Sequence, residues 1–227
     1  MIILPTENEN SSWNLRGPEL LVECYLRLNG YFIVNNFILH DQHGSQKTEV
    51  DLIGVRFPNQ IEIIKDDGGR GQNQKLENDP KLIGKESIID IIIAEVKKGE
   101  ARINRPFGKE EVLEYILNWI GCLNEKEKIK AIKCLKKKED FYTGNGRIRV
   151  RFVCFGEQSK IECKQITLLD ALRFIRGRFR KYFDYKTDSK QWNGVMKYVY
   201  TVAYNNSISD DSLLEKILDG KWNLALK

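Results

Sequence analysis

The feature that most constrains the fold is the stretch Ile88–Lys98, Ile-Ile-Asp-Ile-Ile-Ile-Ala-Glu-Val-Lys-Lys. Its β-branched apolar run predicts a buried strand. Because side chains alternate between the two faces of a strand, Glu95 and Lys97 are expected to point the same way, and Lys98 to point away into solvent. A buried strand normally excludes charge, since an unpaired buried charge costs several kcal/mol. The pair is therefore either an ion pair at a solvated strand end, or a carboxylate for a metal beside an ammonium group for a reacting phosphate.

The composition predicts a globular protein with one domain, or with a core domain and an appendage. The chain has 227 residues, of which 41% are hydrophobic and 30% charged. No apolar run approaches the ~20 residues of a membrane span, and the N-terminus lacks the basic region of a signal peptide. These features predict a cytoplasmic protein that does not enter a membrane. Five cysteines without a Cys-x-x-Cys pair argue against a structural zinc site and against a disulfide framework.

Apolar periodicity predicts the order of helices and strands. Helices are expected over 13–29, 109–123, 125–138 and 168–183, and strands over 31–39, 48–57, 88–97 and 147–155, with a short strand or hairpin at 61–64. The expected fold class is α/β, with a mixed central sheet flanked by helices. We divide the chain into a core domain at 13–165 and a helical C-terminal extension at 166–227 that packs on the core.

Two further acids accompany the charged strand end. Glu19 lies in the first predicted helix, and Asp51 lies inside the second predicted strand, where propensity disfavours aspartate. The helix dipole at an N-terminus is a sufficient structural explanation for Glu19 alone. Together the carboxylates could hold Mg²⁺ or Mn²⁺, which prefer oxygen ligands. Such an ion activates a water and stabilises charge at a phosphodiester, and a lysine beside it stabilises the developing charge.

At these residues the sequence resembles the PD-(D/E)xK nuclease superfamily, with its restriction-endonuclease-like fold. The resemblance covers about residues 15–155 and is closest in pattern to Holliday-junction-resolvase-like nucleases. It implies that Asp51 and Glu95 bind the divalent metal, that Glu19 assists directly or through water, and that Lys97 is the catalytic lysine. Val50 departs from the pattern, since many members have proline there.

Several neighbouring residues complicate the assignment of roles. The 43 residues between Asp51 and Glu95 imply an insertion at 58–87 beside the site, which would cover the site or contact the substrate. Glu23 and Glu49 are competing acids. Asp90 is discounted, because an odd separation from Glu95 places it on the opposite face of the strand.

The net charge of +5 permits nucleic-acid binding without demanding it. The candidate nucleic-acid contacts are Arg147, Arg149, Arg151, Arg176 and Arg180. The first three also fit a solvated sheet face, with the alternating apolar residues turned inward. The last two lie in a predicted helix that is both aromatic and basic, and whose aromatic residues also fit a core.

These features together predict a divalent-metal-dependent nuclease that hydrolyses phosphodiester bonds in DNA, with Mg²⁺ or Mn²⁺ as cofactor. The alternative is a catalytically inactive nucleic-acid-binding protein on the same fold. A homodimer is compatible with either function, but no stretch of the sequence identifies a dimer surface.

Overall fold

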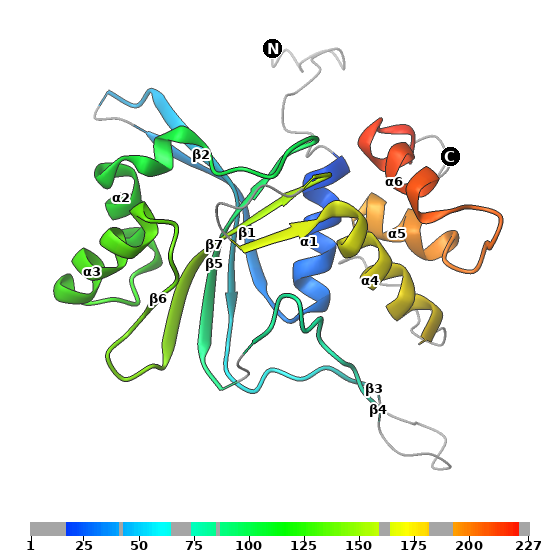
Figure 1. Ribbon diagram of the computed structural model, residues 1–227, viewed down its shortest axis with the longest axis horizontal. Coiled ribbons are helices and arrows are strands. Elements are labelled where there is room, and N and C mark those ends of the chain that lie inside the picture. Colours follow the sequence, from blue (N-terminus) through cyan, green and yellow to red (C-terminus); the bar gives the residue numbers. More distant parts are fainter. Residues whose placement is uncertain are drawn as a thin grey trace, which may run out of the picture.

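The centre of the molecule is a mixed β-sheet with helices on both faces (Figure 1). The structure is a computed structural model, and it describes residues 17–40, 43–64, 74–84, 87–158, 164–181 and 193–222. Within these residues the sheet has six strands in the order β1-β2-β5-β7-β6, with β8 also paired to β7. Its strands are β1 (Phe32–His40), β2 (Gln46–Arg56), β5 (Ile89–Val96), β6 (Phe141–Tyr142), β7 (Ile148–Gly156) and β8 (Lys164–Thr167).

The first three long strands are antiparallel, and β7 then runs parallel to β5. A parallel pair needs a crossover connection, and here helices supply it. These are η1 (Arg105–Gly108), α2 (Glu110–Ile120) and α3 (Glu125–Lys136). The α/β class and the mixed sheet flanked by helices are confirmed.

Two hydrophobic clusters cover the two faces of the sheet. Alternation along β5 divides its side chains between them, because Ile92 and Ala94 join one cluster and Ile91 and Ile93 the other. The second cluster is completed by α2 and α3. The first is completed by α1 (Gly17–Leu28), α4 (Leu168–Lys181), α5 (Gly194–Thr201) and α6 (Asp210–Leu218).

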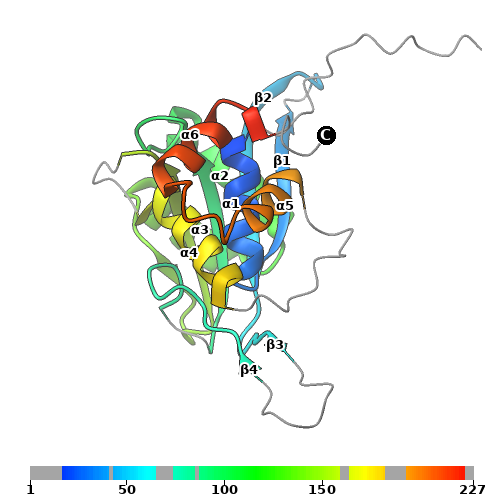
Figure 2. The same cartoon turned by 90° about the vertical axis from the view of Figure 1, so that its right-hand side faces the viewer.

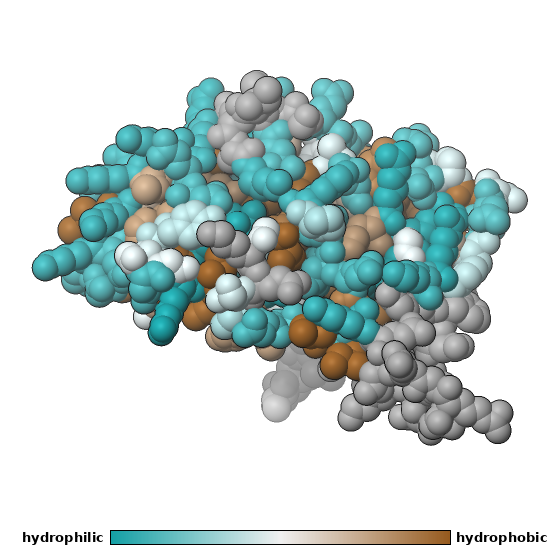
Figure 3. All heavy atoms as spheres, turned by 60° about the horizontal axis from the view of Figure 1, so that its bottom comes forward, coloured by the Kyte–Doolittle hydropathy of each residue, from teal (hydrophilic) through white to brown (hydrophobic). Residues whose placement is uncertain are grey.

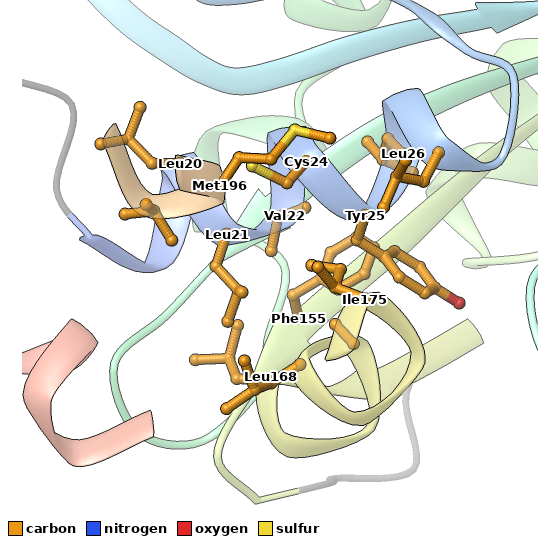
Figure 4. Packing of buried hydrophobic residues seen from close by; sticks show 14 of the residues in the cluster. Leu20, Leu21, Val22, Cys24, Tyr25, Leu26, Phe155, Leu168, Ile175 and Met196 are labelled. Carbon is orange, nitrogen blue, oxygen red and sulfur yellow. The ribbon is translucent and has the colours of Figure 1, made fainter. Parts of the chain in front are cut away.

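The helices after residue 166 share one core with the first helix of the chain. Figure 4 shows Leu21 and Tyr25 of α1 among Phe155, Leu168 and Ile175, which come from β7 and α4. At the N-terminus of α1, a Cβ on Gly17 would lie 2.0 Å from the Ile217 carbonyl oxygen, so α6 approaches as closely as glycine allows. Figure 2 shows α4, α5 and α6 gathered around α1. The predicted boundary at residue 165 falls within β8, a strand of the central sheet.

The short strands β6 and β8 were not predicted. The short strand expected at 61–64 is present as β3 (Ile63–Ile64), which pairs with β4 (Gln74–Lys75). Predicted elements or insertions at 13–16, 65–73, 85–86, 182–183 and 223–227 lie outside the described residues.

None of the described helices is both long and apolar enough to cross a membrane. On the face presented in Figure 3, hydrophobic residues reach the surface in small groups among hydrophilic ones.

Candidate active site

Asp51, Glu95 and Lys97 converge where β5 ends. The Lys97 ammonium group donates to Glu95 Oε2 at 2.9 Å and lies 3.5 Å from Asp51 Oδ2. The backbone N–H of Val96 donates to the same Asp51 oxygen at 2.7 Å. Antiparallel pairing of Leu52 with Ala94 brings the two acids to adjacent strands at the same level of the sheet. The expectation that Glu95 and Lys97 point the same way is confirmed.

Burial makes this cluster electrostatically unusual. The Glu95 side chain has 0% of its surface exposed, against 16% for Asp51 and 23% for Lys97. Burial raises the pKa of the Glu95 carboxyl to about 8, and the Asp51 carboxylate adds to the shift, whereas Lys97 opposes it. Glu95 Oε1 is buried, and no residue in the described part of the chain donates a hydrogen bond to it. A carboxylate oxygen in this state would gain stability from a further cation.

Lys97 is held in its charged form. Burial alone would lower the pKa of its ammonium group, but the carboxylates of Glu95 and Asp51 outweigh burial and raise the pKa above its ordinary value. A protonated lysine can donate hydrogen bonds to a phosphate or to a water, but it cannot accept a proton.

Glu19 lines the same pocket as Asp51 and Lys97. The pocket has a volume of about 400 Å³ and lies between the N-terminus of α1, the end of β5 and the end of α6. Its lining consists of Gly17, Pro18, Glu19, Asp51, Val96, Lys97, Lys98, Leu218, Asp219 and Gly220. Three of the four predicted catalytic residues, Glu19, Asp51 and Lys97, therefore line this pocket, and the fourth, the buried Glu95, accepts a hydrogen bond from Lys97.

Two residues of the pocket were missed or misplaced by sequence reasoning. Lys98 was expected to point away into solvent; its side chain is 61% exposed, as expected, but it also lines the pocket and donates to Asp219 at 3.2 Å. The strand ends at Val96, so the alternation of side chains no longer applies at Lys98. Asp219 follows α6, and no local pattern marks it. Only the packing of α6 against α1 brings Asp219 to the site.

The donor set fits Mg²⁺ or Mn²⁺ with few protein ligands. Among the described residues, no group of three or more His, Cys, Asp or Glu side chains is close enough to hold a metal ion. Mg²⁺ commonly takes only one or two carboxylates and completes its shell with waters and substrate phosphates. Asp51 and Glu95 could supply these two carboxylates, and the partnerless Glu95 Oε1 is available as a ligand.

The competing acids have structural roles or lie elsewhere. Glu23 is buried and pairs with Arg27 at 2.8 Å. Asp90 faces away from Glu95, as expected, and anchors a buried network in which Tyr31 donates to it at 2.5 Å. Glu49 is not among the residues that line the pocket.

The prediction that the side chains of Arg149 and Arg151 are exposed, either on a solvated sheet face or against a nucleic acid, is wrong. Both side chains are buried, and their guanidinium groups donate to Asp90 at 2.7 and 2.8 Å. Asp90 pairs with Arg149 in the parallel register, near the start of both strands, so these arginines lie at the opposite end of the sheet from Glu95. Arg147 is exposed beside that same end.

Arg176 is also unavailable to a nucleic acid, because it is buried and donates to the carbonyls of Ile208 and Asn205 at 2.8 and 2.7 Å. It therefore ties α4 to the α5–α6 connection. Arg180 is exposed, although its Nε donates to the Ala203 carbonyl at 2.5 Å.

Comparison of the chain with protein-family models, with curated proteins and with solved structures gave no match. What the chain does is therefore inferred from the geometry and charge of its own residues.

Proposed function

We propose that the chain is a divalent-metal-dependent nuclease that hydrolyses phosphodiester bonds in DNA. The observation that carries this proposal is the meeting of two carboxylates and a protonated lysine at a pocket, with one buried oxygen of Glu95 lacking a partner. A surface ion pair would explain Glu95 and Lys97 alone, but it would be exposed and worth only ~0–1 kcal/mol. It would also leave Asp51 and the burial of Glu95 unexplained.

Each residue has a role that its position supports. Asp51 and Glu95 would hold Mg²⁺ or Mn²⁺, and the bound ion would supply charge stabilisation at the phosphate and a lower pKa for the attacking water. Lys97 lies beside both carboxylates, so a phosphate bound to an ion that they hold would also lie near its ammonium group. That group can then donate to a phosphate oxygen as negative charge develops there. Glu19, which also lines the pocket, would orient a water there.

The order of elements supports the restriction-endonuclease-like fold as part of the same proposal. Glu19 lies in the helix α1, Asp51 in β2, and Glu95 near the end of β5, with the helix α2 following. This is the order on which the resemblance to the PD-(D/E)xK superfamily depends.

The first prediction tests catalysis directly. Single-stranded, duplex, flap and four-way DNA would each be incubated with the protein in Mg²⁺, in Mn²⁺ and in EDTA. We expect cleavage only with a divalent ion, and a loss of at least ~10²-fold in both site variants. Asp51→Asn weakens the hold on the ion, and Lys97→Ala removes the positive charge beside the reacting phosphate. Glu49→Gln and Lys133→Ala are the matched controls, because both lie outside the pocket.

Undiminished cleavage by both site variants would refute the assignment of the site. Binding of DNA without cleavage of any substrate would favour the alternative, a catalytically inactive nucleic-acid-binding protein on this fold.

A further inference from the structure

A second pocket, with a volume of about 500 Å³, lies between η1 and the end of α3. This volume is in the range of ligand sites in proteins, ~300–1,000 Å³. Its lining consists of Arg102, Ile103, Asn104, Arg105, Phe107, Gly108, Leu135, Lys136, Lys138 and Phe152. The aromatic rings of Phe107 and Phe152 are buried and lie 5.8 Å apart, so they form an apolar floor beneath a basic rim.

The rim of this pocket carries four cationic side chains, and none of the lining residues is acidic. Arg102 and Arg105 are exposed, and neither makes a hydrogen bond or an ion pair with any residue in the described part of the chain. Lys136 has a partner in Glu110, but at 3.4 Å and in an exposed position. Like charges around one cavity repel each other, and an anionic ligand would offset that repulsion.

The dipole of α3 explains only two of the four cationic side chains, Lys136 and Lys138. Lys136 is the last residue of α3 and Lys138 follows it closely, and a helix C-terminus favours cations. Arg102 and Arg105 come from the connection between β5 and α2, and no helix C-terminus accounts for them. Their convergence with the lysines is what marks the pocket as a site for an anion.

The connection that carries these arginines starts at the candidate active site. Five residue steps separate Lys97 from Arg102, so their Cα atoms are at most ~18 Å apart. This upper limit corresponds to at most about five nucleotide steps along one strand of B-form DNA, so one strand is long enough to reach both sites. Figure 1 shows this connection running from the α1 side of the sheet to α2.

The same connection is fixed to β7 and its continuation. Ala101 N–H donates to the Gln158 carbonyl at 2.9 Å, and Glu157 N–H donates to the Gly99 carbonyl at 2.8 Å. These bonds fix Gly99 and Ala101, the residues between Lys97 and Arg102, and so restrict how far Arg102 can move relative to Lys97.

We propose that this basic pocket binds the sugar–phosphate backbone of a nucleic-acid strand while a phosphate further along the same strand occupies the candidate active site. This inference rests on the proposed nuclease function and extends it to the substrate's path. Arg102 and Arg105 contact phosphates, and the apolar floor accommodates a sugar or a base.

The test measures binding separately from cleavage. A fluorescein-labelled DNA of about 20 nucleotides, single-stranded or duplex, would be titrated with protein in EDTA across a series of salt concentrations. The double variant Arg102→Glu/Arg105→Glu should bind at least ~10-fold more weakly. The neutral variant Arg102→Gln/Arg105→Gln should lower the slope of log K against log salt by about two phosphate contacts, ~0.7–0.9 for each.

The matched control is Lys126→Glu/Lys130→Glu, which makes the same change in net charge on exposed positions of α3 that do not line the pocket. Equal weakening in the control and the arginine variants would overturn the inference, because it would reflect net charge alone. A wild-type protein that cleaves DNA, together with arginine variants that bind normally, would also overturn it while leaving the proposed function standing. A wild-type protein that neither binds nor cleaves would refute both proposals.

Discussion

Glu95 is the residue at which function and stability oppose each other most clearly. Its carboxyl is fully buried, one oxygen has no partner, and its pKa is raised to about 8. Even with Lys97 beside it, ionising this group in the folded chain costs free energy when no metal ion is bound. Such a group persists where its charge is needed, so the burial itself supports a role as a metal ligand.

The sign of the resulting pH dependence follows from that pKa. Between the ordinary value of 4.5 and about 8, the folded state binds more protons at Glu95 than the unfolded state does. The free energy of unfolding therefore falls as pH rises through this window. Glu95→Gln removes the ionisation, so we expect the variant to gain a few degrees in Tm over wild type near pH 8 in EDTA, and less near pH 5.

Thermal denaturation at both pH values checks this prediction, with Glu49→Gln as the control. Mg²⁺ should raise the Tm of wild type but not of Glu95→Gln, because a bound ion stabilises only the chain that holds it. A Tm difference that is the same at both pH values would show that Glu95 does not titrate in this window.

Asp90 illustrates the opposite case, a buried charge that is fully paired. Burial alone would raise the pKa of Asp90, but hydrogen bonds and charge from Arg149 and Arg151 outweigh burial and lower it. A lowered pKa means that the stabilisation is present above the unfolded-state pKa and is lost as pH falls through the folded-state pKa.

We predict that Asp90→Asn destabilises the fold by ~3–5 kcal/mol, because it leaves two buried guanidinium groups without a counter-charge. Urea denaturation at neutral pH measures the effect. Asp140→Asn is the control, since Asp140 lies 3.9 Å from Arg149 and is 36% exposed, so its loss should cost less than ~1 kcal/mol. Equal effects of the two substitutions would contradict a structural role for the buried network.

The strand β7 shows why the exposure of Arg149 and Arg151 was predicted wrongly. Its alternation of arginine with apolar residues is typical of a strand with one solvated face, and both faces of this strand are in fact covered. The first hydrophobic cluster lies on the arginine face, and Asp90 of the neighbouring strand supplies the buried counter-charge. The partner is 59 residues away from Arg149 in the sequence, so no local pattern could identify it.

The end of β7 also fixes the connection that leaves the active site. A Cβ on Gly156 would lie 2.6 Å from both the Ala101 nitrogen and the Gly99 carbonyl oxygen, which leaves no room for a side chain. We predict that Gly156→Ala costs ~1–3 kcal/mol and displaces this connection. DNA cleavage should then fall more than in Gly144→Ala, where a Cβ meets no atom within 4 Å.

Chemical denaturation and cleavage assays on the two alanine variants measure these effects. A Gly156→Ala protein with wild-type stability and activity would show that the 99–101 segment can shift without affecting the site.

For the whole molecule, the sequence predicted the main strands, the α/β class and the convergence of Asp51, Glu95 and Lys97. These succeed because each depends on local alternation and on strand order. The packing of a helical extension on the core was predicted, but its sharing of one cluster with α1 and the place of Asp219 in the pocket were not, because both depend on contacts between the two ends of the chain.

The last prediction concerns that shared core. A chain that stops at residue 165 would keep the sheet strands through part of β8 but would expose the face of α1 that α4, α5 and α6 bury, including Leu21 and Tyr25. Each such apolar side chain contributes about 1.5–3 kcal/mol by its burial, so exposing even a few of them costs an amount comparable to the ~5–15 kcal/mol that stabilises a typical domain. We therefore expect residues 1–165 alone to aggregate or to lack cooperative unfolding, and co-expression with residues 166–227 to restore both. Size-exclusion chromatography and thermal denaturation followed by circular dichroism distinguish the outcomes. A monomeric fragment that unfolds cooperatively by itself would instead show that the C-terminal helices are a separable appendage, and that Asp219 is not needed to build the pocket.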